Sequence, residues 1–201
     1  MNKYDLLIKN GMVHTAVESF EAEIGVSEGK ITAIGQNLGH AERVIDAEGM
    51  LVLPGGIDAH CHIEQESSTR IMTADDFYSG SVSAAFGGNT TFLPFAAQHR
   101  GQSLREVVDT ARERARNKAV IDYGLHLIIS DPTQNVLEVE LPSLIKEGYT
   151  SFKVYMTYEM LKINDREMLD ILAVARRHGA LTMVHAENNE VINWISDRLI
   201  Q

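Results

Sequence analysis

The sequence predicts an α/β fold: a (β/α)8 barrel, represented by about its first five βα units and preceded by a small β-sandwich portion. Apolar, strand-like segments begin near Ile57, Thr90, Tyr123, Thr150 and Leu181, at intervals of 27 to 33 residues. Segments of helical pattern lie between them, and this alternation is typical of βα units on a parallel sheet. Residues 1–53 instead contain short strand-like segments separated by turn sequences.

The N-terminal portion, residues 1–53, is expected to form antiparallel hairpins. Asn10-Gly11 lies between two strand-like segments, and Asn-Gly is a strong signal for a tight hairpin. Two further turn sequences separate strand-like segments in the same way, at residues 27–30 and 46–49. Three hairpins in succession predict a small antiparallel sheet or sandwich layer.

The second portion, residues 54–201, contains the helix signals that the barrel requires. A capping box, Asn164-x-x-Glu167, opens a helix that ends at Gly179. Three more helices are expected to begin at Asp75 or Asp76, at Ser103, and near residue 135. An open doubly wound sheet is the other arrangement of such units. No G-x-G-x-x-G sequence follows the first strand, so the nucleotide-binding version of that fold is disfavoured.

Composition restricts the class of protein. The 201 residues are 44% hydrophobic and 23% charged, as in soluble globular proteins, and no apolar run is long enough to span a bilayer. The net charge of −10 argues against nucleic acid or an anionic membrane as a partner. The first residues lack the pattern of a secretory signal, and the single cysteine, Cys61, fits a reducing compartment. These features predict a cytoplasmic protein.

Candidate metal ligands lie on the first barrel strand. Asp58, His60 and His62 alternate along it and therefore share one face, where two imidazoles can meet one metal ion. Cys61 faces the opposite side and is interpreted as a small buried apolar residue. Asp58 lies deeper in the strand and is interpreted as a supporting or structural group.

The fourth strand places Lys153 and Tyr155 on one face. Burying an unpaired ammonium group is costly, so a lysine that points into a barrel needs a reason. Three interpretations compete: a buried salt bridge, a catalytic amine of lowered pKa, or a carbamate formed with carbon dioxide that binds metal. The fifth strand ends in His185, which shares its face with Met183 and Glu187. Since barrel active sites lie at the carboxyl ends of the strands, His185 is a further candidate ligand.

Four segments together resemble the dihydropyrimidinase and D-hydantoinase family of cyclic amidohydrolases, within the metal-dependent amidohydrolase superfamily. They are residues 50–66 (MLVLPGGIDAHCHIEQE), 75–91 (DDFYSGSVSAAFGGNTT), 150–158 (TSFKVYMTY) and 180–189 (ALTMVHAENN). The resemblance runs over essentially the whole chain, and it implies a barrel of the metal-dependent hydrolase kind. In this family the corresponding residues hold two divalent metals, usually zinc.

Carried over by position, the resemblance implies His60 and His62 on one metal, Lys153 as a bridging carbamate, and His185 on the second metal. Tyr155 would be both catalytic and substrate-binding, with its hydroxyl donating to the oxygen of the scissile carbonyl. A hydroxide that bridges the metals would open the cyclic amide of hydantoins or 5,6-dihydropyrimidines to N-carbamoyl amino acids, a reaction of pyrimidine catabolism. The implied partner is a small cyclic ureide or imide, and homotetramers are common in the family.

Other functions stay open at this point. Allantoinase and dihydroorotase share the early His-x-His, although Tyr155 in its sequence context favours the hydantoinase. A non-catalytic assembly protein resembling the collapsin-response mediators is a rival, although such proteins lack these metal ligands. An inactive fragment is a third. The polar loop at residues 63–68 departs from many relatives and leaves the substrate side-chain preference open, and its acidic run, 64–66, is interpreted as a solvated loop.

Two groups that the family uses are missing from the expected positions. The family takes a further histidine from its sixth strand and an aspartate from its eighth. Three more βα units would need roughly 93 residues at the observed period, whereas fourteen follow Glu187. None of residues 188–201 can supply those groups. The chain is therefore expected to be truncated.

Overall fold

The computed structural model describes residues 3–67 and 71–200, and Ser68 of the predicted polar loop lies outside them. The chain divides into two compact units, Met1–Gly55 and Gly56–Gln201. None of the described helices is long and apolar enough to cross a membrane.

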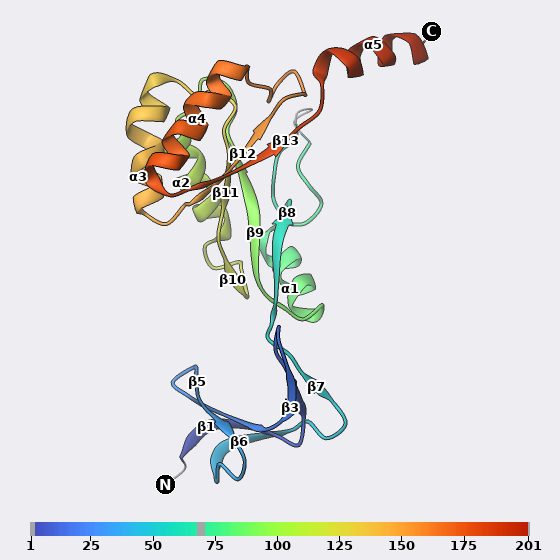
Figure 1. The fold of residues 1–201 in the computed structure, drawn as a ribbon, viewed down its shortest axis with the longest axis vertical. Helices are drawn as coiled ribbons and strands as arrows, with labels where there is room; N and C mark the ends of the chain where they lie inside the picture. The colour runs from blue at the N-terminus through green and yellow to red at the C-terminus, as the bar shows by residue number, and fades with distance from the viewer. Residues whose placement is uncertain (1–2, 68–70, 201) are drawn as a thin grey trace. The chain divides into compact units, whose positions relative to one another are not determined.

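The first unit consists of two small sheets, drawn in blue in Figure 1. Side chains from both sheets, among them Val13, Phe20, Ile24 and Val26, share one core. One sheet has the order β5-β4-β1-β6, formed by Lys30–Gly35, Glu23–Ser27, Tyr4–Lys9 and Ala41–Asp46; the other has the order β3-β2-β7, formed by Ser19–Glu21, Met12–His14 and Leu51–Val52. The predicted N-terminal β portion is therefore present.

Only one of the three predicted hairpins forms. Strands β4 and β5 pair antiparallel as expected. The hairpins at Asn10-Gly11 and at residues 46–49 are wrong, because β1 pairs with β6 and β2 pairs with β7, both in parallel. A type I′ hairpin turn needs positive φ at both central residues, and of the pair only Asn10 has it, at 61°. Each segment instead leaves one sheet at its turn and enters the other.

Gly11 marks the place where these two segments approach most closely. A Cβ atom there would lie 2.6 Å from Cγ2 of Val52 and 2.9 Å from Cβ of Ala47. The backbone N–H of Ala47 donates to the carbonyl of Lys9 nearby, at 2.8 Å. Asn10 donates from Nδ2 to Oδ1 of Asp46, at 2.9 Å. The Asn-Gly sequence thus lies where the chain passes from one sheet to the other.

The Gly11→Ala variant is expected to lower the free energy of unfolding by about 1–3 kcal/mol, because the added methyl group overpacks this crossing. Urea unfolding of wild type and variant measures the loss. The matched control is Gly35→Ala in β5, where a Cβ would meet only Cδ2 of Leu38 at an ordinary 3.5 Å. Equal stabilities for the two variants would contradict the close approach at Gly11.

The second unit contains an open parallel sheet whose main strands follow chain order, as a partial barrel requires. Strands β8, β9, β11, β12 and β13 each pair in parallel with the next. They comprise Gly56–Cys61, Asn89–Ala97, His126–Ile128, Ser151–Tyr155 and Leu181–His185. The predicted third strand is interrupted, and its first part, β10 (Asp122–Tyr123), pairs separately with β9. The predicted partial (β/α)8 barrel is confirmed.

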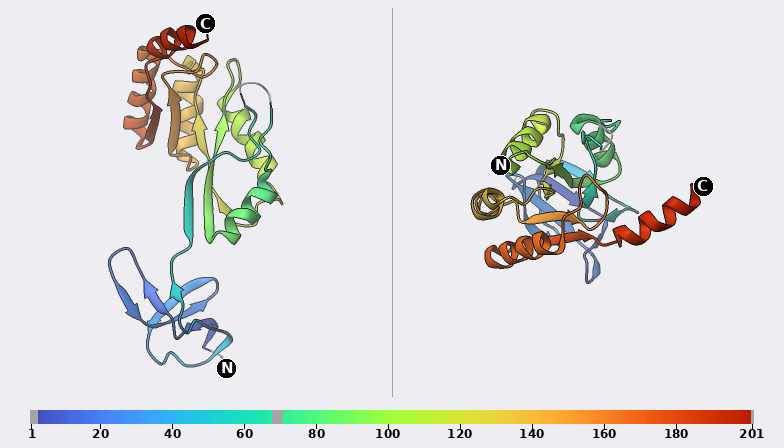
Figure 2. Two further views of the ribbon diagram at one scale, coloured as in Figure 1. Left: turned by 90° about the vertical axis from the view of Figure 1, so that its right-hand side faces the viewer. Right: turned by 90° about the horizontal axis from the view of Figure 1, so that it is seen from above.

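The helices pack mainly on one side of this sheet, where α2, α3 and α4 lie together (Figures 1 and 2). Apolar residues of the strands, among them Leu127, Phe152 and Val154, are fully buried against them. The helices are α1 (Phe77–Phe86), α2 (Leu104–Ala115), the π-helix η1 (Val136–Glu140) continuing into α3 (Leu141–Lys146), α4 (Asp165–His178) and α5 (Asn189–Leu199). The last of these was not predicted.

Capping side chains begin α1, α2 and α4 where the sequence indicates. Asp76 accepts from the backbone N–H of Ser79, and the capping box of Asn164 and Glu167 forms with both of its bonds. Helix α4 ends at Gly179, whose φ of 76° is left-handed. At α2, Ser103 accepts from the N–H of Glu106 as expected.

Candidate metal-binding site

Strand β8 and the residue after it present two imidazoles side by side. The ring centroids of His60 and His62 are 5.5 Å apart, and both rings lie against Phe95 of β9, at 4.7 and 5.0 Å. Both histidines are exposed. The strand alternation that predicted a shared face therefore brings the two rings together, at the carboxyl end of the strand.

Hydrogen bonds orient both residues. Nδ1 of His62 lies 2.7 Å from Oε1 of Gln65, an oxygen that can only accept, so Nδ1 carries the proton. In the neutral ring this leaves Nε2 with a free lone pair, the usual form of a metal-binding histidine. The backbone N–H of His60 donates to Oδ1 of Asp58, at 3.0 Å. Asp58 thus supports the backbone that carries the first histidine.

The electrostatic surroundings of His60 favour its neutral form. Although His60 is exposed overall, desolvation by the groups packed on its ring lowers the pKa of the imidazole most, and electrostatic repulsion from the neighbouring His62 and Lys153 lowers the pKa further. A neutral imidazole is the state that binds a metal. Cys61, on the other side of the strand, packs against the core with Phe77 and Phe92. Burial and the charge of Asp58 raise the pKa of its thiol to about 11, which fits an apolar packing role.

Strand β12 brings Lys153 and Tyr155 to one face. The Nζ of Lys153 lies 5.4 Å from the centroid of the Tyr155 ring. No salt bridge between described residues includes Lys153, although its side chain is half-buried. Of the three interpretations of this lysine, the buried salt bridge therefore has no partner in the described part of the chain.

Tyr155 and His185 are cross-strand neighbours on β12 and β13. Their rings stack, with centroids 5.5 Å apart and an interplanar angle of 20°. Tyr155 is 9% exposed, and burial, followed by the nearby Tyr158, raises the pKa of its phenol. The phenol therefore stays protonated at neutral pH and can donate a hydrogen bond. His185 hydrogen-bonds through Nε2 to the carboxylate of Glu187.

The candidate residues form two neighbouring groups. His60 and His62 make one, and Lys153, Tyr155 and His185 make the other. No cluster of three or more His, Cys, Asp or Glu side chains close enough to hold a metal occurs within residues 3–67 and 71–200.

The loop after β8 makes more contacts with the rest of the protein than is expected for a solvated acidic loop. The side chain of Glu64 is 17% exposed and forms an ion pair with Lys118, at 3.0 Å. Its Oε2 also accepts from the backbone N–H of Phe77, at 3.2 Å, while Arg114 donates to its backbone carbonyl, at 2.9 Å. The interpretation of Glu64 as a solvated residue is therefore wrong, because its carboxylate ties the loop to α1 and its backbone carbonyl ties the loop to α2.

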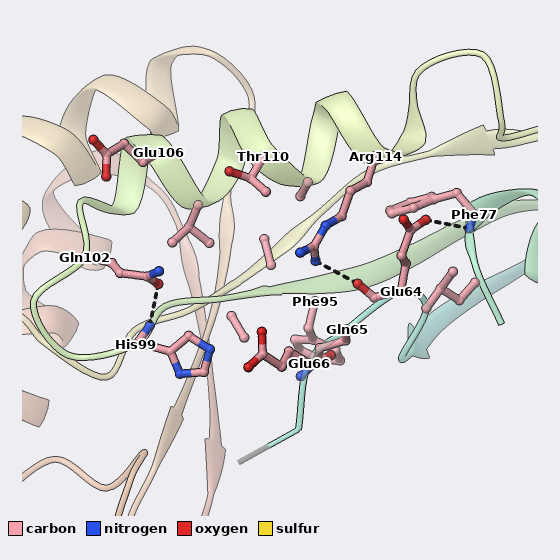
Figure 3. A pocket seen from close by; sticks show the side chains of 15 residues that line it. Glu64, Gln65, Glu66, Phe77, Phe95, His99, Gln102, Glu106, Thr110 and Arg114 are labelled. Carbon is pink, nitrogen blue, oxygen red and sulfur yellow. Dashed lines mark hydrogen bonds between the residues drawn. The ribbon is translucent and has the colours of Figure 1, made fainter. Parts of the chain in front are cut away.

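A polar cavity of about 210 Å³ lies beneath this loop, between α2 and β9. Figure 3 shows Arg114 extending from α2 toward Glu64, with Gln65 and Glu66 beside Phe95. Because Gln65 also bonds His62, the loop connects the cavity to the first histidine pair.

Asp76, which caps α1 and also pairs with Lys118, is expected to make the stability of the protein depend on pH. The backbone N–H of Ser79 chiefly, and Lys118 as well, hold the pKa of Asp76 below its ordinary value of 3.8. A lowered folded-state pKa gives stability that is present above the unfolded value and is lost as pH falls through the folded value. The Asp76→Asn variant should therefore lose less stability than wild type below about pH 4. Urea unfolding across this range measures it, and parallel pH profiles would contradict the assignment.

Sequence reasoning missed two residues that contact this region. Gln65 lies three positions after His62, and an amide at that spacing carries no specific signal. His126 is buried on β11 and contacts both β8 and β12. Its position on the inward face of the third strand was the available signal, but it has no histidine or acidic partner in the sequence.

Comparison with known proteins identifies relatives over almost the whole chain. A D-hydantoinase of Geobacillus stearothermophilus is 45% identical over 198 residues, which cover 97% of this chain and 42% of the relative. A solved D-hydantoinase structure is 46% identical and superimposes with a TM-score of 0.93, covering 98% of this chain and 43% of that one. A dihydropyrimidinase structure from Brevibacillus agri is 41% identical, with a TM-score of 0.92 and coverages of 96% and 42%.

These matches confirm the resemblance to the D-hydantoinases and dihydropyrimidinases. The chain spans about two fifths of the length of the relatives it matches. The family model described as "Amidohydrolase family" matches residues 51–200, which make up most of the chain. The chain therefore belongs to the amidohydrolase family.

Proposed function

We propose that this protein is a metal-dependent cyclic amidohydrolase that opens hydantoin or 5,6-dihydropyrimidine rings to N-carbamoyl amino acids. The observation that carries the proposal is the placement of His60, His62, Lys153, Tyr155 and His185 at or near the carboxyl ends of three strands of a partial barrel. That edge is where barrel enzymes carry out catalysis. The similarity to D-hydantoinases over nearly the whole chain supports the choice of substrate class.

The donor set fits two divalent cations, with zinc as the proposed metal. His60, His62 and His185 offer imidazoles, and Lys153 offers an amine with no described carboxylate partner. We infer that Lys153 carries a carbamate, since an anion with two oxygens links the two groups of ligands where an ammonium cannot. When bound, such a pair of cations supplies Lewis acidity and a water of lowered pKa.

Tyr155 has the arrangement that an oxyanion donor needs. Its ring is fixed by stacking on His185, and its protonated hydroxyl forms no hydrogen bond with any described residue. The hydroxyl is thus free to donate to a substrate carbonyl oxygen as negative charge develops there. The substrate carbonyl is placed between Tyr155 and the metal ligands in this proposal.

The rival functions receive less support. The relatives reported above carry the names D-hydantoinase and dihydropyrimidinase, which supports the hydantoinase over allantoinase and dihydroorotase. A non-catalytic assembly protein would have no need for the four ligand-type residues. A small cyclic ureide or imide as the substrate, a homo-oligomeric state and a cytoplasmic location stay predictions from the sequence.

Two measurements on the purified protein test the proposal. Elemental analysis is expected to find bound divalent metal, and hydantoin and dihydrouracil are expected to be converted to their N-carbamoyl products. Removal of the metal by a chelator should abolish turnover, and added zinc should restore it. A metal-free protein that still opens either ring, or a metal-loaded protein that opens neither, would contradict the proposal.

A further inference from the structure

His126 is a buried histidine that connects three strands. It is 6% exposed and lies on β11. Its Nε2 lies 3.0 Å from the backbone carbonyl of Ala59 in β8, and its Nδ1 lies 2.5 Å from Oγ of Ser151 in β12. Its ring is also 5.2 Å from that of Phe95 in β9. No other role for this residue arises from the proposed chemistry.

The two hydrogen bonds fix the tautomer of the neutral His126 ring. A carbonyl oxygen can only accept, so Nε2 must carry a proton and donate to Ala59. In the neutral ring Nδ1 then accepts from the hydroxyl of Ser151. The ring is thereby held in one orientation, with its Nε2–H directed at the strand that carries His60.

The backbone of β8 is irregular at the point that His126 contacts. Asp58 pairs with Phe92 and Cys61 pairs with Pro94, so β8 advances by three residues where β9 advances by two. This is a bulge, and such an extra residue is left unpaired in the ladder. Pro94 adds to the disruption, because proline has no backbone N–H to donate.

Side chains provide hydrogen bonds within the bulge. The N–H of His60 donates to Oδ1 of Asp58, and the carbonyl of Ala59 accepts from His126. These two contacts therefore fix the peptide between Ala59 and His60, and with it the direction of the His60 side chain.

We propose that His126 is a positioning residue for the metal site, which holds the bulged part of β8 so that His60 and His62 face the ligands on β12 and β13. The part of this inference that concerns metal rests on the proposed function. Residues that orient ligands typically contribute 10- to 100-fold to metal affinity. A core histidine that merely fills space would contribute to stability alone.

Four variants separate these roles. His126→Phe and His126→Leu remove the Nε2–H, and the smaller leucine covers the case in which a phenylalanine ring prevents folding. His126→Gln keeps an N–H donor at a similar distance along the side chain. Val174→Ala in α4 is the control, since it weakens the buried core without contact to β8.

Hydrogen exchange of the metal-free protein gives the first readout. Peptides that cover residues 57–62 are expected to exchange about 10-fold faster in His126→Phe or His126→Leu, while peptides of α2 keep the wild-type rate. His126→Gln should exchange at nearly the wild-type rate. Zinc affinity, measured by competition with a chelator, is expected to fall about 10-fold in the donor-free variants, and not in Val174→Ala.

The outcomes keep the two proposals distinct. If wild type binds no divalent cation, the proposed function fails, while the exchange data still decide whether His126 orders β8. Unchanged exchange at residues 57–62 in the donor-free variants would overturn the positioning role. So would equal losses of zinc affinity in these variants and in Val174→Ala, because the effect would then follow from general destabilisation.

Discussion

Replacing Lys153 by alanine is expected to abolish tight binding of the metal pair and to reduce ring opening by at least about 10³-fold, since metal-ion catalysis contributes several kcal/mol to such reactions. The physical reason lies in the geometry of the site. The His60–His62 pair is on β8 and His185 is on β13, and Lys153 is the ligand-type side chain on β12 between β13 and the rest of the sheet. Without it, the two groups share no ligand.

Metal content, turnover and a direct probe of the carbamate test this expectation. Elemental analysis of Lys153→Ala should find less metal than in wild type. With ¹³C-labelled bicarbonate, wild type should show a carbamate carbon signal by NMR that the variant lacks. Lys146→Ala is the control, because Lys146 is exposed in the last turn of α3 and should leave both properties unchanged. A Lys153→Ala protein that keeps its metals and its rate would show that the carbamate assignment is wrong.

The barrel strands and the site faces could be predicted because they depend on local periodicity. In β12, Phe152 and Val154 are buried against helices while Lys153 and Tyr155 lie on the other face, as alternation requires. Parallel strands in chain order then bring the ends of β8, β12 and β13 to the same edge of the sheet. Two short-range rules therefore locate residues that are more than 120 positions apart in the sequence, such as His60 and His185.

The features that sequence reasoning missed depend on contacts between distant segments. Asn10-Gly11 resembles a hairpin turn locally, yet the partner of this segment is the stretch that contains Ala47 and Val52. Glu64 resembles a solvated residue until Lys118, more than 50 positions away, supplies an ion pair. His126 is recognisable only once the bulge in β8 exposes a carbonyl for it to bind. In each case the deciding partner has no fixed spacing along the chain.

The Tyr155→Phe variant is expected to lower kcat by about 10²–10³-fold, the usual cost of removing one oxyanion donor. Metal content should be unchanged, because phenylalanine keeps the ring that stacks on His185. Stability should also change by less than about 1 kcal/mol, since the Tyr155 hydroxyl forms no hydrogen bond with any described residue that the substitution would remove. The loss is thus predicted in the reaction step alone.

Steady-state kinetics distinguish this role from simple substrate binding. A donor whose hydrogen bond strengthens as the carbonyl oxygen gains charge affects kcat, whereas one that contacts the ground state equally raises KM with kcat unchanged. Tyr158→Phe is the matched control, because this second phenol also lies against His185, with ring centroids 5.0 Å apart, but is 53% exposed. Comparable losses of kcat in both variants would assign the effect to the surroundings of His185. A loss confined to Tyr155→Phe, with metal retained, requires that the buried and protonated hydroxyl act on the reacting carbonyl.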